Sequence, residues 1–232
     1  MQELDRAMNI ARRIYSLGVA ILLTACSTVS PSNDPFESTN RMIFSFNDKV
    51  DSWALRPVAE VYETDTPQWL RTGVGNFFDN LQDVDTACNN ALQARFSDAA
   101  SDAARVALNS TFGIGGLINV ATGAGLPKHR QDFGQTLGRW GVGTGPYLVL
   151  PLIGPSSVRD TLALPVDIRL NPMAYVYPVS SRNLGTALNL IDTRAYLLSV
   201  SNLLDDAALD KYEFTRSAYR QRRENSIYRS DQ

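Results

Sequence analysis

Histidine, cysteine and net charge are all scarce in this sequence. One histidine and two cysteines occur among its 232 residues, so the four ligands of a usual structural zinc site cannot be assembled. The 22 basic and 24 acidic side chains leave a net charge of -2, which provides no field to attract nucleic acid. No serine lies in a G-x-S-x-G motif, and no Walker sequence is present. These absences argue against a metal site, a nucleic-acid partner and a cofactor, and they favour a protein that is not an enzyme.

The N-terminus has the pattern of an exported protein. A charged segment ending in Arg12-Arg13 precedes an apolar run from Ile14 to Leu23, about ten residues, which suits a signal peptide and is too short to span a bilayer. The run leads into Thr24-Ala25-Cys26, which resembles the lipobox of bacterial lipoproteins with Cys26 as the lipidated first residue. Because a serine and not an aspartate follows at position 27, the resemblance implies the periplasmic face of the outer membrane. The alternative is a buried cysteine that ends an ordinary N-terminal helix.

Four segments follow from this pattern. We expect a signal peptide over residues 1–25, a lipidated N-terminus and flexible tether over 26–33, one helical domain over 34–224 and a polar tail over 225–232. Translation starts at Met1 or Met8. With Cys26 lipidated, Cys88 has no partner for an intramolecular disulfide, and we interpret it as a small apolar core residue.

The domain is expected to be all-α. Apolar side chains recur at steps of three and four residues, and no run alternates apolar and polar residues long enough to indicate a sheet. The expected helices start at Asp34-Pro35 and at Thr66-Pro67, run over 84–96, from a capping Ser97 through 109, around 184–198, and from 210 to about 223.

The segment 138–157 does not suit a plain helix. It has glycine at 138, 141, 143 and 145, followed by the mostly apolar run Tyr147 to Ile153, which Pro151 interrupts. The run is too short to span a membrane, and a soluble protein has little reason to expose it. We interpret it as a hinged apolar hairpin. The alternative is a buried connection with glycines at positive φ.

Short motifs in a fixed order connect the domain to a known family. They are Asp34-Pro35-Phe36-Glu37, Asn40-Arg41, Phe46-Asn47, Arg56-Pro57-Val58-Ala59, the segments 108–116 and 133–143, Gly145-Pro146-Tyr147, Leu150-Pro151, Gly154-Pro155-Ser156, Arg159-Asp160, Thr193-Arg194-Ala195 and Ala218-Tyr219. Behind a lipobox, this order resembles the MlaA/VacJ family of outer-membrane lipoproteins over nearly all of 34–223. Asp48 departs from the pattern, which leads us to expect an apolar or small residue there.

The resemblance implies a ring of amphipathic helices lying in the membrane interface, with an amphipathic channel. Such a protein removes mislocalised phospholipids from the outer leaflet, passes them to a soluble periplasmic carrier and sits beside trimeric porins, which maintains lipid asymmetry. The residue patterns agree, because amphipathic helices and a lipid anchor describe a protein that lies in an interface.

Several residues are candidates for roles in that function. Gly141, Gly143 and Gly145 are candidate hinges for the hairpin that contains Tyr147 and Pro151. Three further residues are candidates for contact with the channel or a headgroup: Asn47, Arg159 and Asp160. Asn47 either sets the first helix or is a plain surface amide, and Arg159-Asp160 either meets a lipid phosphate or forms a local ion pair. The arginines at 216, 220, 222 and 223 most simply form a solvated helix face.

Two other functions stay open. A lipid hydrolase would need a nucleophile paired with His129, which lies among basic residues and is most simply a surface loop residue. A structural envelope lipoprotein that scaffolds a porin complex would explain the anchor and the helices, but it leaves the hairpin without a purpose.

Overall fold

The computed structural model describes residues 34–228, except the side chains at 203, 204, 206, 207 and 228. Two units are distinguished, Met1–Pro35 and Phe36–Gln232, and all the described helices and strands belong to the second. The predicted signal peptide, Cys26 and the tether lie outside the described residues, as does the end of the tail.

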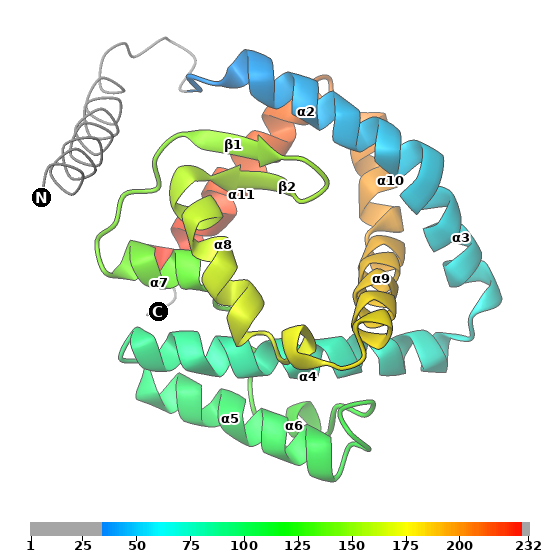
Figure 1. Cartoon of the computed structure of the whole chain (residues 1–232), viewed down its shortest axis with the longest axis vertical. Coiled ribbons are helices and arrows are strands. Elements are labelled where there is room, and N and C mark those ends of the chain that lie inside the picture. The colour runs from blue at the N-terminus through cyan, green and yellow to red at the C-terminus, as the bar shows by residue number, and fades with distance from the viewer. Residues whose placement is uncertain (1–33, 229–232) are drawn as a thin grey trace, which may run out of the picture. The chain divides into compact units, whose positions relative to one another are not determined.

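The second unit is mostly helical, as predicted. Its elements are α2 (Glu37–Val50), η2 (Asp51–Leu55), α3 (Arg56–Asp65), α4 (Gln68–Leu92), α5 (Phe96–Thr111), α6 (Val120–Gly123), α7 (Phe133–Arg139), β1 (Tyr147–Leu150), β2 (Gly154–Ser157), α8 (Val158–Leu170), η3 (Pro172–Tyr175), α9 (Val179–Tyr196), α10 (Leu198–Ala207) and α11 (Lys211–Tyr228). They close into a circuit: α3 packs on α9, α9 on α4, α4 on α7, α7 on α11, and α11 on the strands, which pack on α2 (Figure 1). Helix α5 packs along α4 outside that circuit.

Several helix boundaries differ from the expectation. Helix α2 begins at Glu37 after Phe36, and α4 begins at Gln68 after Pro67, each without a side-chain cap. The pattern over 84–96 is not a separate helix, because α4 continues unbroken to Leu92. Helix α5 begins at Phe96, so the expected cap at position 97 lies inside it. Hydrophobic periodicity predicts that a helix is present more reliably than it predicts the first and last residues, because helices that start one or two residues apart differ little in free energy.

A π-helix joins α2 to α3. Pro57 follows it at the start of α3 and has no N–H to continue the helical ladder. The wider turn of η2 carries the helix past this gap. Arg194 of α9 pairs with Asp51 at the start of η2, with Nε and Oδ1 2.6 Å apart, so the irregular turn is fixed to the opposite helix.

The hairpin predicted from the apolar run is present as two antiparallel strands. Tyr147 pairs with Ser157 and Leu150 with Gly154 in the register. Each strand has only four residues, which is why no run of alternating apolar and polar residues indicates a sheet in the sequence. Tyr147 and Val149 are buried, and Tyr147 packs against Tyr212 and Tyr219 of α11.

Polar side chains dominate what is buried in the described part of the chain. Its largest fully buried side chains are Arg105, Tyr147, Asn40, Asn89, Asn90, Thr86, Thr136, Asp83, Asp102 and Ser157. Buried hydrophobic residues are mostly small, or are tyrosines that pack near the hairpin. Charged and amide side chains are rarely buried in globular proteins unless they are paired, so each of these groups needs partners inside the fold.

The contact between α4 and α5 shows how these groups are paired. We call its residues the α4–α5 polar core: Asp83, Asn90, Asp102, Arg105, Lys128 and His129. The guanidinium of Arg105 donates to Asp83 Oδ2 (3.1 Å) and to the carbonyl oxygen of Leu126 (2.7 Å). On the other side, Asp102 accepts a hydrogen bond from Asn90 (2.7 Å) and lies 2.9 Å from Nδ1 of His129. The helices are therefore held together by charge and amide groups where a globular protein has aliphatic packing.

Candidate functional site

The outer surface has the opposite composition. All three tryptophans of the chain are exposed, Trp53 to 86%, Trp69 to 74% and Trp140 to 54%. Other large exposed hydrophobic residues include Met42, Phe96, Phe112, Leu152, Ile153, Leu162, Tyr177, Leu184 and Tyr196. An apolar surface of this extent marks contact with a membrane or a partner, and tryptophan and tyrosine favour the membrane–water interface. Within residues 34–228, every helix is too short or too polar to cross a membrane.

The side chains of α2 hold the hairpin through two asparagines. Asn40 donates to the carbonyl oxygen of Tyr147 (3.0 Å) and accepts from the N–H of Val149 (2.9 Å). Two helical turns further on, Asn47 donates to the carbonyl oxygen of Leu150 (2.9 Å) and accepts from the N–H of Leu152 (2.8 Å). Asn40 therefore pairs with the edge of β1 as a neighbouring strand would, and Asn47 bridges the end of β1 and the turn that follows it. We call this pair the asparagine clamp.

The clamp gives Asn47 a contact that the sequence left open and adds Asn40, which sequence reasoning missed as a site residue. One signal was available: two asparagines seven residues apart lie on the same helix face. Leu152, at the hairpin tip, has φ +64°, a left-handed conformation that is uncommon for leucine. The bond from its N–H to Asn47 holds the tip in that conformation.

The candidate hinge glycines lie in an exposed connection between α7 and β1. Gly141 (φ +90°) and Gly145 (φ +69°) have backbone conformations that favour glycine, and a Cβ at Gly145 would also crowd Val158. Gly143 has neither constraint, because an added Cβ would meet nothing within 4 Å. Residues 141–145 are exposed, whereas Tyr147 and Val149 in the following strand are buried, so the segment has features of both the hinged hairpin and the buried connection with glycines at positive φ. Tyr147 anchors the base of the hairpin, and Pro151 is exposed in its turn.

Arg159 and Asp160 are buried at the start of α8 and belong to an ion-pair network. Arg159 Nε lies 2.9 Å from Asp160 Oδ1, and the other carboxylate oxygen accepts from Arg223 Nε (2.9 Å) and from the hydroxyl of Tyr219. Arg159 is only 3% exposed, so the ion-pair interpretation fits the geometry and the headgroup contact lacks the exposure it needs. Arg223 also pairs with Asp132, so it is not part of a solvated helix face.

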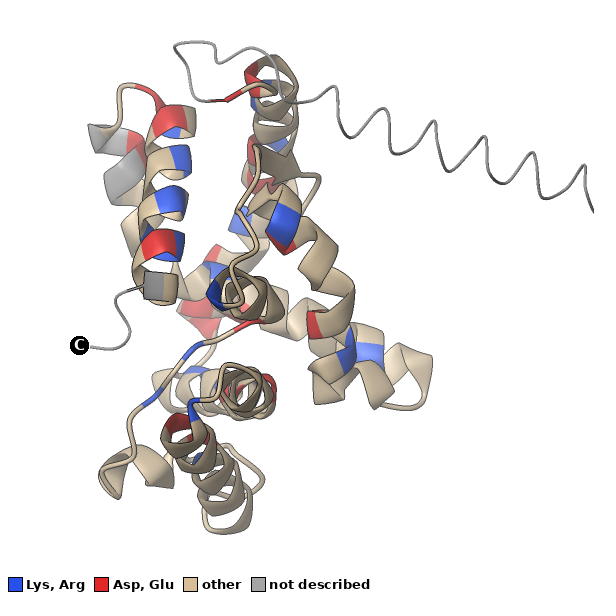
Figure 2. Cartoon of the chain, turned by 90° about the vertical axis from the view of Figure 1, so that its left-hand side faces the viewer, with Lys and Arg blue, Asp and Glu red and all other residues tan. Residues whose placement is uncertain are grey.

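Burial and neighbouring charges shift the pKa values of Asp160 and Tyr219. Burial alone would raise the pKa of the Asp160 carboxyl, but Arg223, Tyr219 and Arg159 together hold it below its usual value. Burial and the neighbouring Asp160 raise the pKa of Tyr219 to about 12. Asp160 is therefore a charged anchor, and α11 is joined through it to α8. Figure 2 shows charges of both signs following one another along α11.

His129 is not a plain surface loop residue. Its Nδ1 lies 2.9 Å from Asp102 Oδ1, and its Nε2 lies 3.9 Å from Asp98 Oδ1. Both ring nitrogens thus face carboxylates, and only Asp102 lies at hydrogen-bond distance.

This helical unit, with buried polar groups, exposed hydrophobic side chains and a hairpin held by the asparagine clamp, can now be compared with known proteins. Residues 32–226 match the model of the MlaA lipoprotein family. The chain belongs to the MlaA family.

Relatives with high similarity support this assignment. The chain is 34% identical over 223 residues to the intermembrane phospholipid transport system lipoprotein MlaA of Escherichia coli, covering 93% of this chain and 88% of that one. It is 38% identical over 215 residues to an uncharacterized protein of Rickettsia bellii, covering 92% and 83%. A solved structure from work on maintenance of bacterial outer membrane lipid asymmetry is similar with a TM-score of 0.74 and 35% identity, covering 84% of this chain and 98% of the other.

Proposed function

We propose that this chain is the outer-membrane lipoprotein of an intermembrane phospholipid transport system. It removes mislocalised phospholipids from the outer leaflet through an amphipathic channel and passes them to a soluble periplasmic carrier, which maintains lipid asymmetry. The observation that carries the proposal is an inverted distribution of polarity: large hydrophobic side chains, including all three tryptophans, are exposed, and most of the largest fully buried side chains are amides, hydroxyls or charged groups.

This inversion suits a protein that moves lipid. A phospholipid leaving a leaflet needs polar groups near its headgroup while its chains stay in apolar surroundings, because desolvated charge is costly. A helical unit with an apolar exterior can lie within the leaflet, and a polar path through it would receive the headgroup. The helices then need not span the membrane, which fits the hydropathy of those in residues 34–228.

The anchor and the partners complete the proposal. Cys26, following a signal peptide over residues 1–25, carries the lipid that holds the chain at the periplasmic face of the outer membrane, and 26–33 is the tether to the helical domain. A trimeric porin lies beside the domain, and the carrier collects the lipid.

The hairpin is proposed as the gate and the preceding glycines as its hinge. Gly143→Val is the sharpest variant, because the added side chain has space and no positive φ to violate. We expect it to change phospholipid removal while leaving the folded domain intact, since valine restricts the φ/ψ changes a hinge requires. Gly123→Val, at another exposed glycine with no close neighbour, is the matched control. Equal phospholipid removal by Gly143→Val and the unmodified chain, at equal protein levels, would contradict the hinge.

The test of the function is the phospholipid content of the outer leaflet in cells that lack this gene. We expect phospholipid to accumulate at the surface and the unmodified chain to reverse this. Cys26→Ala, which cannot be lipidated, is expected to fail. An unchanged surface, with the protein shown to be expressed in the parent strain, would instead favour a scaffold that binds a porin without moving lipid.

A further inference from the structure

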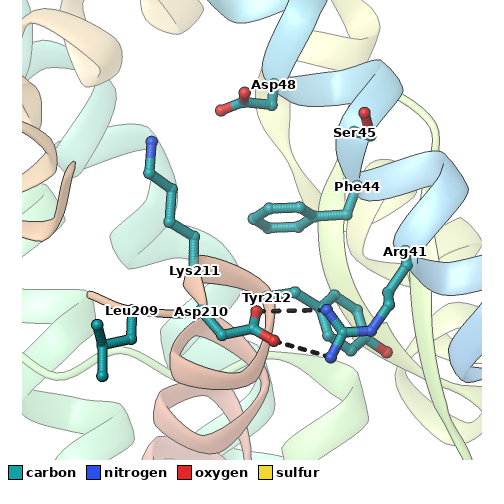
Figure 3. Close-up of a pocket in the computed structure, with 8 residues that line it drawn as sticks. All are labelled: Arg41, Phe44, Ser45, Asp48, Leu209, Asp210, Lys211 and Tyr212. Carbon is teal, nitrogen blue, oxygen red and sulfur yellow. Dashed lines mark hydrogen bonds and ion pairs between the residues drawn. The ribbon is translucent and has the colours of Figure 1, made fainter.

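A cavity of about 370 Å³ opens between α2 and the start of α11 (Figure 3). It is lined by Arg41, Phe44, Ser45, Asp48, Leu209, Asp210, Lys211 and Tyr212. Its volume is at the lower end of the range for small-molecule sites, about 300–1,000 Å³. That size suits the headgroup of a phospholipid better than the whole two-chain molecule.

One end of the cavity is closed by groups that already have partners. The guanidinium of Arg41 pairs with both carboxylate oxygens of Asp210, at 3.3 and 2.9 Å, and lies 4.4 Å from the ring centroid of Tyr212. Phe44 packs edge-on against the same ring. Arg41 is therefore part of a fixed wall.

The other end presents one group of each charge. Figure 3 shows the carboxylate of Asp48 and the ammonium of Lys211 directed into the open part of the cavity. Lys211 Nζ lies 2.7 Å from Asp205 Oδ1, and the other oxygen of that carboxylate is bonded to Arg56. Because one carboxylate serves two cations and an ammonium has three N–H donors, Lys211 keeps both charge and donors for a ligand.

Asp48 is the distinctive group. Among the residues whose side chains the structure describes, none forms an ion pair or hydrogen bond with its carboxylate, although its charge helps to raise the pKa of Lys211, after the hydrogen bond from Lys211 to Asp205. Asp48 is exposed on α2, so its carboxylate is available to a ligand.

We propose that this cavity binds the headgroup of a zwitterionic phospholipid that carries a phosphate and a primary amine. Lys211 binds the phosphate and Asp48 binds the ammonium. The lining holds two cations and two carboxylates, so a ligand with no net charge matches it, and an anionic headgroup would leave Asp48 opposed by like charge. The inference rests on the proposed function and adds headgroup selectivity to it.

Binding by the full chain in detergent micelles tests the assignment. Phosphatidylethanolamine and phosphatidylglycerol with identical acyl chains are titrated separately, and bound lipid is counted by native mass spectrometry. We expect the unmodified chain to prefer phosphatidylethanolamine and Asp48→Asn to reduce that preference roughly tenfold, the effect of losing one charge-assisted hydrogen bond. Lys211→Gln is expected to weaken both lipids, since both carry the phosphate. Asp65→Asn, which removes an exposed carboxylate at the end of α3, should leave the preference unchanged.

The outcomes separate the two proposals. If Asp48→Asn binds both lipids as the unmodified chain does, with unchanged circular dichroism, the headgroup site is overturned while phospholipid binding stands. If the unmodified chain binds neither lipid, the proposed function itself fails, and the site with it. If soluble glycerophosphoethanolamine displaces the lipid at equal concentration, the cavity belongs to a soluble phosphate–amine ligand and the lipid assignment is overturned.

Discussion

Replacing Arg105 with alanine is expected to lower the free energy of unfolding by about 3–5 kcal/mol, the usual effect of removing one partner of a buried ion pair. Arg105 is 1% exposed and bonds to Asp83, Thr122 and the carbonyl oxygen of Leu126. The variant leaves Asp83 buried with Lys128 as its remaining cation. Chemical unfolding in a fixed detergent, followed by circular dichroism, measures the change.

Two further variants make the Arg105 result interpretable. Arg130→Ala breaks an ion pair with Asp79 in which both side chains are largely exposed, and we expect it to cost less than about 1 kcal/mol. Arg105→Met combined with Asp83→Asn removes both charges and should be less destabilised than Arg105→Ala alone, because no buried carboxylate then depends on Lys128 as its one remaining cation. Equal losses for Arg105→Ala and Arg130→Ala would show that the α4–α5 polar core is hydrated and contributes little.

The two residues of the asparagine clamp are expected to differ in their effect when each is replaced by alanine. Asn40 is 1% exposed, so Asn40→Ala leaves a buried carbonyl group at Tyr147 and a buried N–H at Val149 unpaired. Each orphaned group costs about 1–3 kcal/mol, which gives a loss of about 2–6 kcal/mol in the free energy of unfolding. Asn47→Ala removes contacts nearer the exposed tip, so we expect little loss of global stability and faster amide exchange at Leu152, by about tenfold or more.

Hydrogen exchange and unfolding measurements distinguish these two roles. Asn76→Ala is the control, because its amide makes one exposed bond, to the carbonyl oxygen of Leu117. If the hairpin gates lipid passage, Asn47→Ala should also alter phospholipid removal in cells, whereas Asn76→Ala should not. An exchange rate at Leu152 unchanged by Asn47→Ala would mean that the β1–β2 pairing alone holds the tip.

Hydrophobic periodicity predicts where the helices of this protein run but not which face they bury. In α4, the polar residues Asn80, Asp83, Thr86 and Asn90 recur at steps of three and four, as regularly as the apolar side chains do. An interpretation that assumes an aqueous surrounding predicts that this polar stripe faces the solvent. The structure buries it, because α5 supplies Asp102 and Arg105 as partners. The pattern defines two faces, and the surrounding medium decides which one turns outward.

The sequence predicts the hairpin of the candidate site but not the side chains that hold it. The glycines and the apolar run 147–153 are local features, so the hairpin could be located from the sequence. The groups that hold it are distant: Asn40 and Val149 are 109 residues apart, and Tyr219 and Asp160 are 59 apart. Such pairs carry no local signal, and an asparagine in a helix most simply indicates a polar surface position. The same holds for Asp102 and His129 across the α4–α5 polar core.

The exposed tryptophans bear on how the chain is delivered to a membrane as well as on where it resides. An exported lipoprotein bound for the outer membrane must cross an aqueous compartment, and a folded unit with Trp53, Trp69 and Trp140 on its surface would self-associate there. If the chain is delivered to the outer membrane as proposed, we expect these exposed side chains to be shielded before insertion, by an escort or by delayed folding. Under the proposed location, folding and delivery are coupled, because exposed apolar side chains that suit a lipid environment promote association in water.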